Sequence, residues 1–91
     1  MNYAIEISDP NLSGVILADA ATRSEISAIV RDAGSWRNYG DGDVLLAEPT
    51  VYVYTGQTAD DIREYREMTG DPYPDFCVET GPRGGVSWIR S

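Results

Sequence analysis

Residues 22–34 read Thr-Arg-Ser-Glu-Ile-Ser-Ala-Ile-Val-Arg-Asp-Ala-Gly. Thr22 followed three residues later by Glu25 forms a capping-box pattern, in which each side chain accepts the backbone N–H of the other residue. Apolar residues then recur at the spacing of one helix face, and Gly34 stands where helices commonly end in a left-handed residue. The apolar positions are Ile26, Ile29, Val30 and Ala33. The stretch predicts an amphipathic helix over 22–33 that must bury one face.

The residues before this helix alternate in the manner of β-strands. Tyr3, Ile5 and Ile7 are separated by Ala4 and Glu6, which is typical of a strand with one buried face. Turn-forming residues then lead to a second apolar segment, Val-Ile-Leu-Ala, over 15–18. The two segments predict an antiparallel hairpin.

A second helix is predicted over 59–69. Thr58 and Asp61 repeat the cap, with Asp in the place of Glu, and Gly70 marks the end. Its apolar stripe is thin, so most of its circumference should face water. The stripe consists of Ala59, Ile62, Tyr65 and Met68.

Four further strands complete an expected order of ββαββαββ. They are the segments 44–47, 51–54, 76–80 and 86–90, with a turn-rich loop over 35–43 and a hairpin loop over 81–85. Antiparallel strands with helices on one face are the natural packing for such an order. We therefore predict an α+β fold with a mostly antiparallel sheet of about five to six strands and two helices on one face. The length of 91 residues fits a single domain over 1–91.

The composition excludes several classes of chemistry. The chain contains no His and no Lys, which removes Ser–His and Cys–His nucleophile pairs, His-ligated zinc sites and Schiff-base lysines. Cys77 is the single cysteine, and a lone cysteine between Phe76 and Val78 is most often a small buried residue. A catalytic pair of carboxylates stays open by residue type, but nothing marks one pair over another. We expect no enzyme activity, no cofactor and no metal site.

The formal net charge is −8, and it bears on the choice of partner. Nucleic acid and anionic membranes are poor direct partners because both require a basic face. A basic protein surface is favoured instead, although solubility alone also explains such a charge. The first residues lack the pattern of a signal peptide, and no apolar run is long enough to span a bilayer. The expected location is the cytoplasm.

The second predicted helix carries the main candidates for partner binding. Asp60, Glu64 and Glu67 share one stripe, and Asp71 extends it past the helix end, with neighbours ~5–6 Å apart. Phosphates along one nucleic-acid strand have a similar spacing, so the stripe could occupy the arginine and lysine sites of a nucleic-acid-binding protein. A solvated helix face explains the same residues, because acidic side chains favour a helix N-terminus and Arg63 interrupts the negative field.

Three other residues are candidates for the same role. Tyr52 and Tyr54 share the strand face expected to point away from the core, and tyrosine is common at interfaces. Arg83 stands at the tip of the last hairpin loop, where it could contact a partner. The segment Asn38 to Asp43, which includes Asp41, lacks the spacing of a calcium loop, and a turn accounts for it.

In size and charge the chain resembles small inhibitors encoded by phages and mobile elements, some of which mimic DNA. The resemblance includes no motif, so it assigns no residue a role. The leading hypothesis is a non-catalytic acidic protein that binds and blocks a basic, nucleic-acid-binding protein. The alternatives are a structural or accessory domain that forms homo-oligomers, and a small metal- or ligand-binding enzyme.

Overall fold

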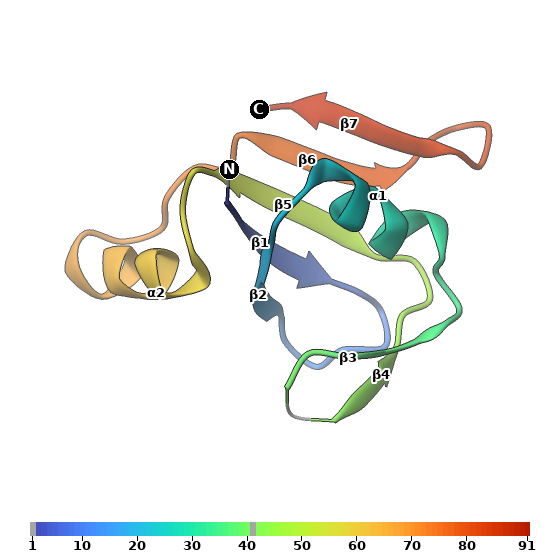
Figure 1. Ribbon diagram of the computed structural model, residues 1–91, viewed down its shortest axis with the longest axis horizontal. Helices are drawn as coiled ribbons and strands as arrows, with labels where there is room; N and C mark the ends of the chain where they lie inside the picture. The colour runs from blue at the N-terminus through green and yellow to red at the C-terminus, as the bar shows by residue number, and fades with distance from the viewer. Residues whose placement is uncertain (1, 41) are drawn as a thin grey trace.

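A computed structural model describes residues 2–40 and 42–91 and shows an α+β fold (Figure 1). The main sheet contains β1 (Tyr3–Ser8), β2 (Ile16–Ala20), β5 (Thr50–Thr55), β6 (Phe76–Thr80) and β7 (Val86–Arg90). The helices are α1 (Arg23–Arg31) and α2 (Ala59–Met68), and a second, two-stranded sheet contains β3 (Trp36–Asn38) and β4 (Asp43–Leu45). The predicted fold class and the antiparallel sheet are confirmed.

The main sheet has the strand order β2-β1-β5-β6-β7, and every pairing in it is antiparallel. The two predicted hairpins, β1–β2 and β6–β7, form its flanks. The strand β5 lies between them and pairs with both β1 and β6. In its pairing with β1, Tyr3 lies opposite Thr55 and Ser8 lies opposite Thr50. Successive strand residues point to opposite faces of the sheet. The odd-numbered residues of β1 face the main core, where Ile5 and Ile7 are at most 1% exposed.

The helix α1 lies on one face of this sheet and covers the main core. Thr22 accepts the N–H of Glu25 as predicted, but the Glu25 carboxylate accepts the N–H of Ala21 rather than that of Thr22. The helix ends at Arg31, earlier than predicted, and Gly34 has a φ of +95° in the turn that follows. Its buried residues are Ile26, Ile29 and Val30, which pack on Ile5, Ile7, Val51, Val53 and Val78.

The helix α2 lies on the opposite face, which corrects the prediction that both helices share one face. Ile62 is fully buried and packs with Ala4 and Tyr54. Ile5 and Val53, which follow or precede these residues in their strands, belong to the core under α1. Successive strand residues point to opposite faces of a sheet, so the sheet lies between the two helices.

The buried apolar residues of α2 all come from its first turns. Of the predicted apolar stripe, Ala59 and Ile62 are buried, whereas Tyr65 and Met68 are 48% and 76% exposed. A spacing of three residues falls about 60° short of a full helical turn. The stripe therefore winds around α2, and Met68 lies on the side away from Ala59.

The small sheet adds one strand to the predicted order, which becomes ββαβββαββ. The segment predicted as a loop contains β3, whose Trp36 lies opposite Leu45 in β4. The strand β4 also ends before Leu46, because Leu46 turns into the core and is 1% exposed. Strands of three residues have too little alternation to be distinguished from a loop. Asp41, from the segment weighed as a calcium loop, lies outside the described residues.

Candidate partner-binding surface

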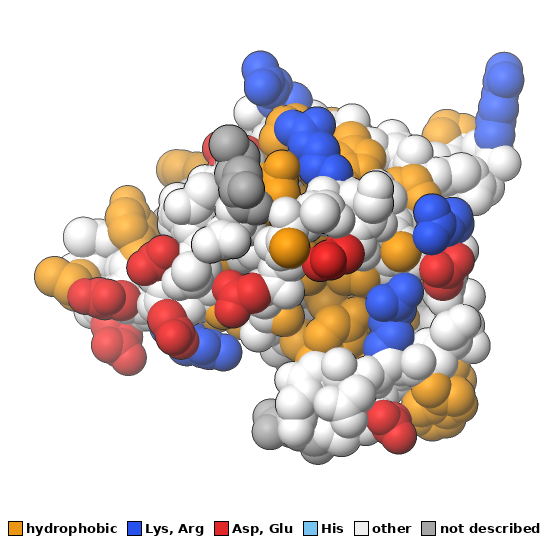
Figure 2. All heavy atoms as spheres, in the orientation of Figure 1, with side chains coloured by type: hydrophobic (Ala, Val, Ile, Leu, Met, Phe, Trp, Pro, Cys, Tyr) orange, Lys and Arg blue, Asp and Glu red, His pale blue; other side chains and the backbone are white. Residues whose placement is uncertain are grey.

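Acidic side chains collect around α2, which stands at one end of the molecule (Figures 1 and 2). Asp60, Glu64 and Glu67 are exposed on the helix, as the predicted stripe requires. Asp71 follows the helix, and its side chain is 86% exposed. The structure thus brings the four predicted carboxylates together at the end of the molecule where α2 lies.

Two arginines of α2 neutralise part of this stripe. Arg63 Nη1 lies 2.8 Å from Asp60 Oδ1, and Arg66 Nε lies 3.1 Å from Asp71 Oδ1. Within the described part of the chain, Glu64 and Glu67 have no ion-pair partner. The continuous negative stripe is therefore reduced to two carboxylates that are available to another molecule.

Exposed apolar side chains accompany these two carboxylates. Tyr65 and Met68 line a shallow hollow beside Glu64, and Tyr73, in the segment after the helix, is 94% exposed. Apolar patches with a charged rim are typical of protein–protein contact sites. We name the set Glu64, Tyr65, Glu67, Met68 and Tyr73 the α2 surface. The predicted apolar stripe included Tyr65 and Met68, and its three-residue spacing is the signal that could have shown their exposure.

The inner side of α2 is held to the sheet by polar contacts. Arg66 Nη2 lies 2.6 Å from Glu6 Oε2, and the two side chains are 28% and 14% exposed. At the first turn, Asp19 of β2 accepts the N–H of Ala59 at 2.7 Å. These contacts fix the orientation of a helix that has few buried apolar residues.

The two candidate tyrosines of β5 differ in exposure. Tyr54 is 3% exposed because α2 covers it, so it belongs to the second core and not to the outer surface. Tyr52 is half-buried beside it and lines a groove with Glu6 and Arg66. Both side chains point away from the main core, as predicted. Tyr54 was expected to be exposed on that face, but α2 covers it.

We expect two of the six tyrosines to ionise late in an alkaline titration. Burial raises the pKa of Tyr54 above its usual value of 10.0, and the nearby Glu6 carboxylate raises it further. Burial likewise raises the pKa of Tyr39 from 10.0. The protonated hydroxyls stabilise the fold fully below the unfolded pKa, and this contribution is lost as the pH rises through the folded pKa. Phenolate absorbance measures the titration.

The substitution Tyr54→Phe serves as the control for this titration. One late-ionising group should disappear from the curve. The fold should also lose less stability above the usual tyrosine pKa, because one group fewer is forced to ionise. Ionisation of Tyr54 and Tyr39 at the usual tyrosine pKa in the folded protein would contradict the burial of these two hydroxyls.

Arg83 is exposed in the loop between β6 and β7, at the end of the sheet away from α2 (Figure 1). It therefore does not join the other candidates. Cys77 is half-buried in β6, where burial, aided by the Glu79 carboxylate, raises the pKa of its thiol. A raised pKa favours the thiol over the nucleophilic thiolate, so this site is poorly suited to thiol chemistry.

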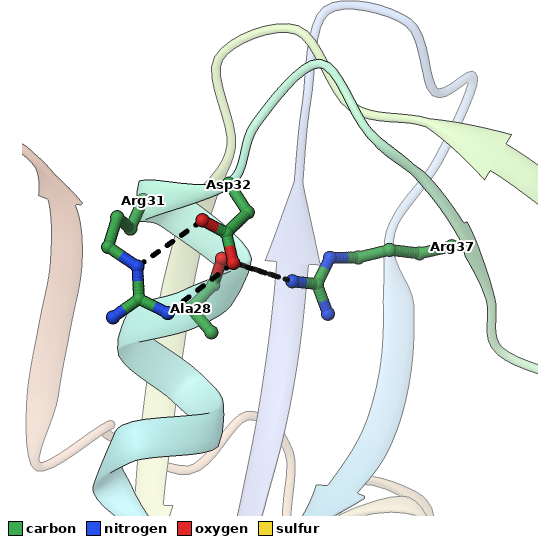
Figure 3. A network of polar contacts seen from close by, with 4 residues as sticks. All are labelled: Ala28, Arg31, Asp32 and Arg37. Carbon is green, nitrogen blue, oxygen red and sulfur yellow. Dashed lines mark hydrogen bonds and ion pairs between the residues drawn. The ribbon is translucent and has the colours of Figure 1, made fainter.

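A polar network at the C-terminal end of α1 has a structural role (Figure 3). Asp32 Oδ1 lies 3.2 Å from Arg31 Nε, and Asp32 Oδ2 lies 3.8 Å from Arg37 Nη2. Arg37 also donates to the carbonyl oxygen of Ala28 at 3.1 Å. Cationic side chains stabilise the carbonyl end of a helix, so these contacts fasten β3 to α1.

No protein-family model, curated protein or solved structure matches this chain. Over residues 2–40 and 42–91, no group of three or more Asp, Glu or Cys side chains is placed to hold a metal ion. Neither helix in this part of the chain has the length and apolar character needed to cross a membrane. The geometry points to the α2 surface as the strongest candidate site, because it joins available carboxylates to exposed apolar side chains.

Proposed function

We propose that this chain is a non-catalytic interaction protein that binds a basic protein through the α2 surface. One observation carries the proposal: Glu64 and Glu67, which have no ion-pair partner in the described part of the chain, stand on α2 with exposed Tyr65 and Met68, and exposed Tyr73 follows in the next segment. The carboxylates would attract cationic side chains and set the orientation of the complex. The tyrosines and the methionine would supply most of the buried area.

The distribution of charge supports a basic partner. Residues 59–75 contain six acidic residues and two arginines, a net charge of −4 out of −8 for the whole chain. A concentrated field of this kind speeds encounters with a positive surface. A nucleic-acid-binding protein is the class to test first, because its binding face is rich in Arg and Lys. The α2 surface would then act as an inhibitor by occupying that face.

We further propose that the chain acts in the cytoplasm, or in the host cytoplasm if a phage encodes it. A single unpaired cysteine, Cys77, agrees with a reducing compartment.

Residues elsewhere in the structure support the interaction role less directly. Trp36, for example, is 68% exposed on β3, but it lies on the small sheet and not beside the acidic residues around α2.

The test is a binding measurement with the double variant Glu64→Arg and Glu67→Arg. A basic partner, captured from lysate and then purified, should bind the variant at least about tenfold more weakly, equivalent to about 1.4 kcal/mol. Affinity for the unaltered chain should also fall as salt rises, because ions screen the attraction. A competing nucleic acid should displace the chain if the partner's nucleic-acid face is the contact.

The matched control is the double variant Asp43→Arg and Glu48→Arg. It changes the net charge by the same amount at two exposed positions outside α2, and we expect it to bind normally. Equal loss in both variants would show that total charge decides binding and not the α2 surface. Normal binding by the α2 variant would refute the proposed site.

A further inference from the structure

The outer edge of the main sheet at β7 has unpaired backbone groups. Hydrogen bonds from Gly81 N to Gly85 O, at 2.6 Å, and from Ser91 N to Asp75 O, at 3.1 Å, fix the pattern of bonding between β6 and β7. Antiparallel strands alternate between bonded and non-bonded residue pairs. By this alternation, three residues of β7 direct their N–H and C=O groups away from β6 toward the open edge. They are Val86, Trp88 and Arg90.

Among the described residues, the arginines that have no carboxylate partner lie along this same edge. Arg23 Cζ lies 4.8 Å from the ring centre of Phe76 and 5.1 Å from that of Trp88, while Arg90 Cζ lies 5.6 Å from Phe76. Arg83 is exposed in the loop before β7. In the described part of the chain, the other four arginines all form ion pairs. Figure 2 shows basic side chains above β7 and at the β6–β7 loop, away from the acidic end.

We propose that the β7 edge binds an extended segment of a partner protein that has an acidic residue at every second position, so that its acidic side chains share one face. The partner segment would add a strand to the sheet through the free backbone groups of β7. Trp88 and Arg90 lie two residues apart and share one face, and Arg23 stacks above that face. An acidic residue at every second position of the added strand would meet these guanidinium groups.

Charge selects this occupant over the alternatives. A second copy paired through β7 would bring a second set of arginines to the same edge, and the added positive charge would repel the first set. A basic segment would meet the same repulsion. Glu79 of β6 lies opposite Ser87, so its side chain is on the other face from Trp88. The acidic α2 end is screened at physiological salt, where the Debye length is ~8 Å.

The test uses amide hydrogen exchange of the full chain with synthetic peptides. One peptide alternates Glu with Val, and its match carries Lys in place of Glu. The Glu peptide should slow exchange at the N–H groups of Val86, Trp88 and Arg90 by about tenfold or more, as expected when solvent-facing amides become bonded. The N–H groups of Ser87 and Ile89 already face β6 and should change little. The Lys peptide should protect none of them.

Two variants separate the role of charge from that of the backbone. The double variant Arg23→Gln with Arg90→Gln should bind the Glu peptide about fivefold or more weakly than the unaltered chain. The matched control, Arg31→Gln with Arg63→Gln, should bind it normally. Equal protection by both peptides, or no alternation among the β7 amides, would overturn the proposal. Protection that rises with protein concentration in the absence of peptide would assign the edge to a second copy instead. None of these outcomes depends on the α2 surface, so the two proposals fail separately.

Discussion

Replacing Asp9 with alanine should lower the free energy of unfolding by about 3 kcal/mol. Asp9 is 7% exposed, and its carboxylate accepts the N–H groups of Asn11 at 2.9 Å, Ala47 at 3.0 Å and Glu48 at 2.8 Å. These bonds join the turn after β1 to the segment that leads into β5. Alanine would leave three partly buried donors without an acceptor, and hydrogen bonds to a charged group are the stronger kind.

Urea unfolding followed by circular dichroism measures this loss. The slope of the free energy of unfolding against urea concentration should stay unchanged. Asp9→Asn retains one acceptor oxygen and should lose about half as much stability as Asp9→Ala. Glu48→Ala is the matched control, because the Glu48 side chain is exposed and should change stability by less than about 0.5 kcal/mol. A loss below about 1 kcal/mol for Asp9→Ala would mean that water replaces the carboxylate.

Replacing Glu6 with alanine should lower the free energy of unfolding by about 2 kcal/mol. The substitution removes the carboxylate 2.6 Å from Arg66 and leaves a guanidinium that is only 28% exposed. The remaining partner, Asp71, is 86% exposed and contributes little in water. Breaking a fully buried ion pair costs more than this, and the partial exposure of Arg66 reduces the penalty.

The double variant Glu6→Ala with Arg66→Ala distinguishes the ion pair from simple loss of packing. It should be less destabilised than the sum of the two single variants, because neither charge is then left alone. Amide exchange within α2 should accelerate in Glu6→Ala more than exchange in β1 and β5. Additive single effects would show that the two charges are not coupled and that the helix is held by Ile62 and its cap.

The parts of the fold that the sequence predicted correctly depend on local signals. The cap at Thr22 and the alternation in β1 act over a few residues, so the first helix and the first hairpin could be recognised. The face occupied by α2 could not, because it depends on which side of β5 is left open after α1 has packed. Tyr54 has the same sequence pattern whether a helix covers it or water does.

The candidate site divides in the same way. The spacing of Asp60, Glu64 and Glu67 was enough to place them together on one helix. The pairing of Arg66 with Glu6 could not be predicted, because the two residues are brought together only when α2 folds back onto β1. The exposure of Met68, in contrast, could have been predicted, because a three-residue spacing winds the apolar stripe around the helix.

The pairing of β1 with β5 also has a consequence for how fast the chain folds. Each hairpin can form from neighbouring residues, but Tyr3 meets Thr55 only after the long intervening segment has been closed into a loop. Closing that loop costs chain entropy before its contacts stabilise the sheet. Folding rates fall as contacts become more distant in sequence. We therefore expect the pairing of β5 with β1, which connects the first hairpin to the rest of the sheet, to be the rate-limiting step, with α1 and the first hairpin already formed.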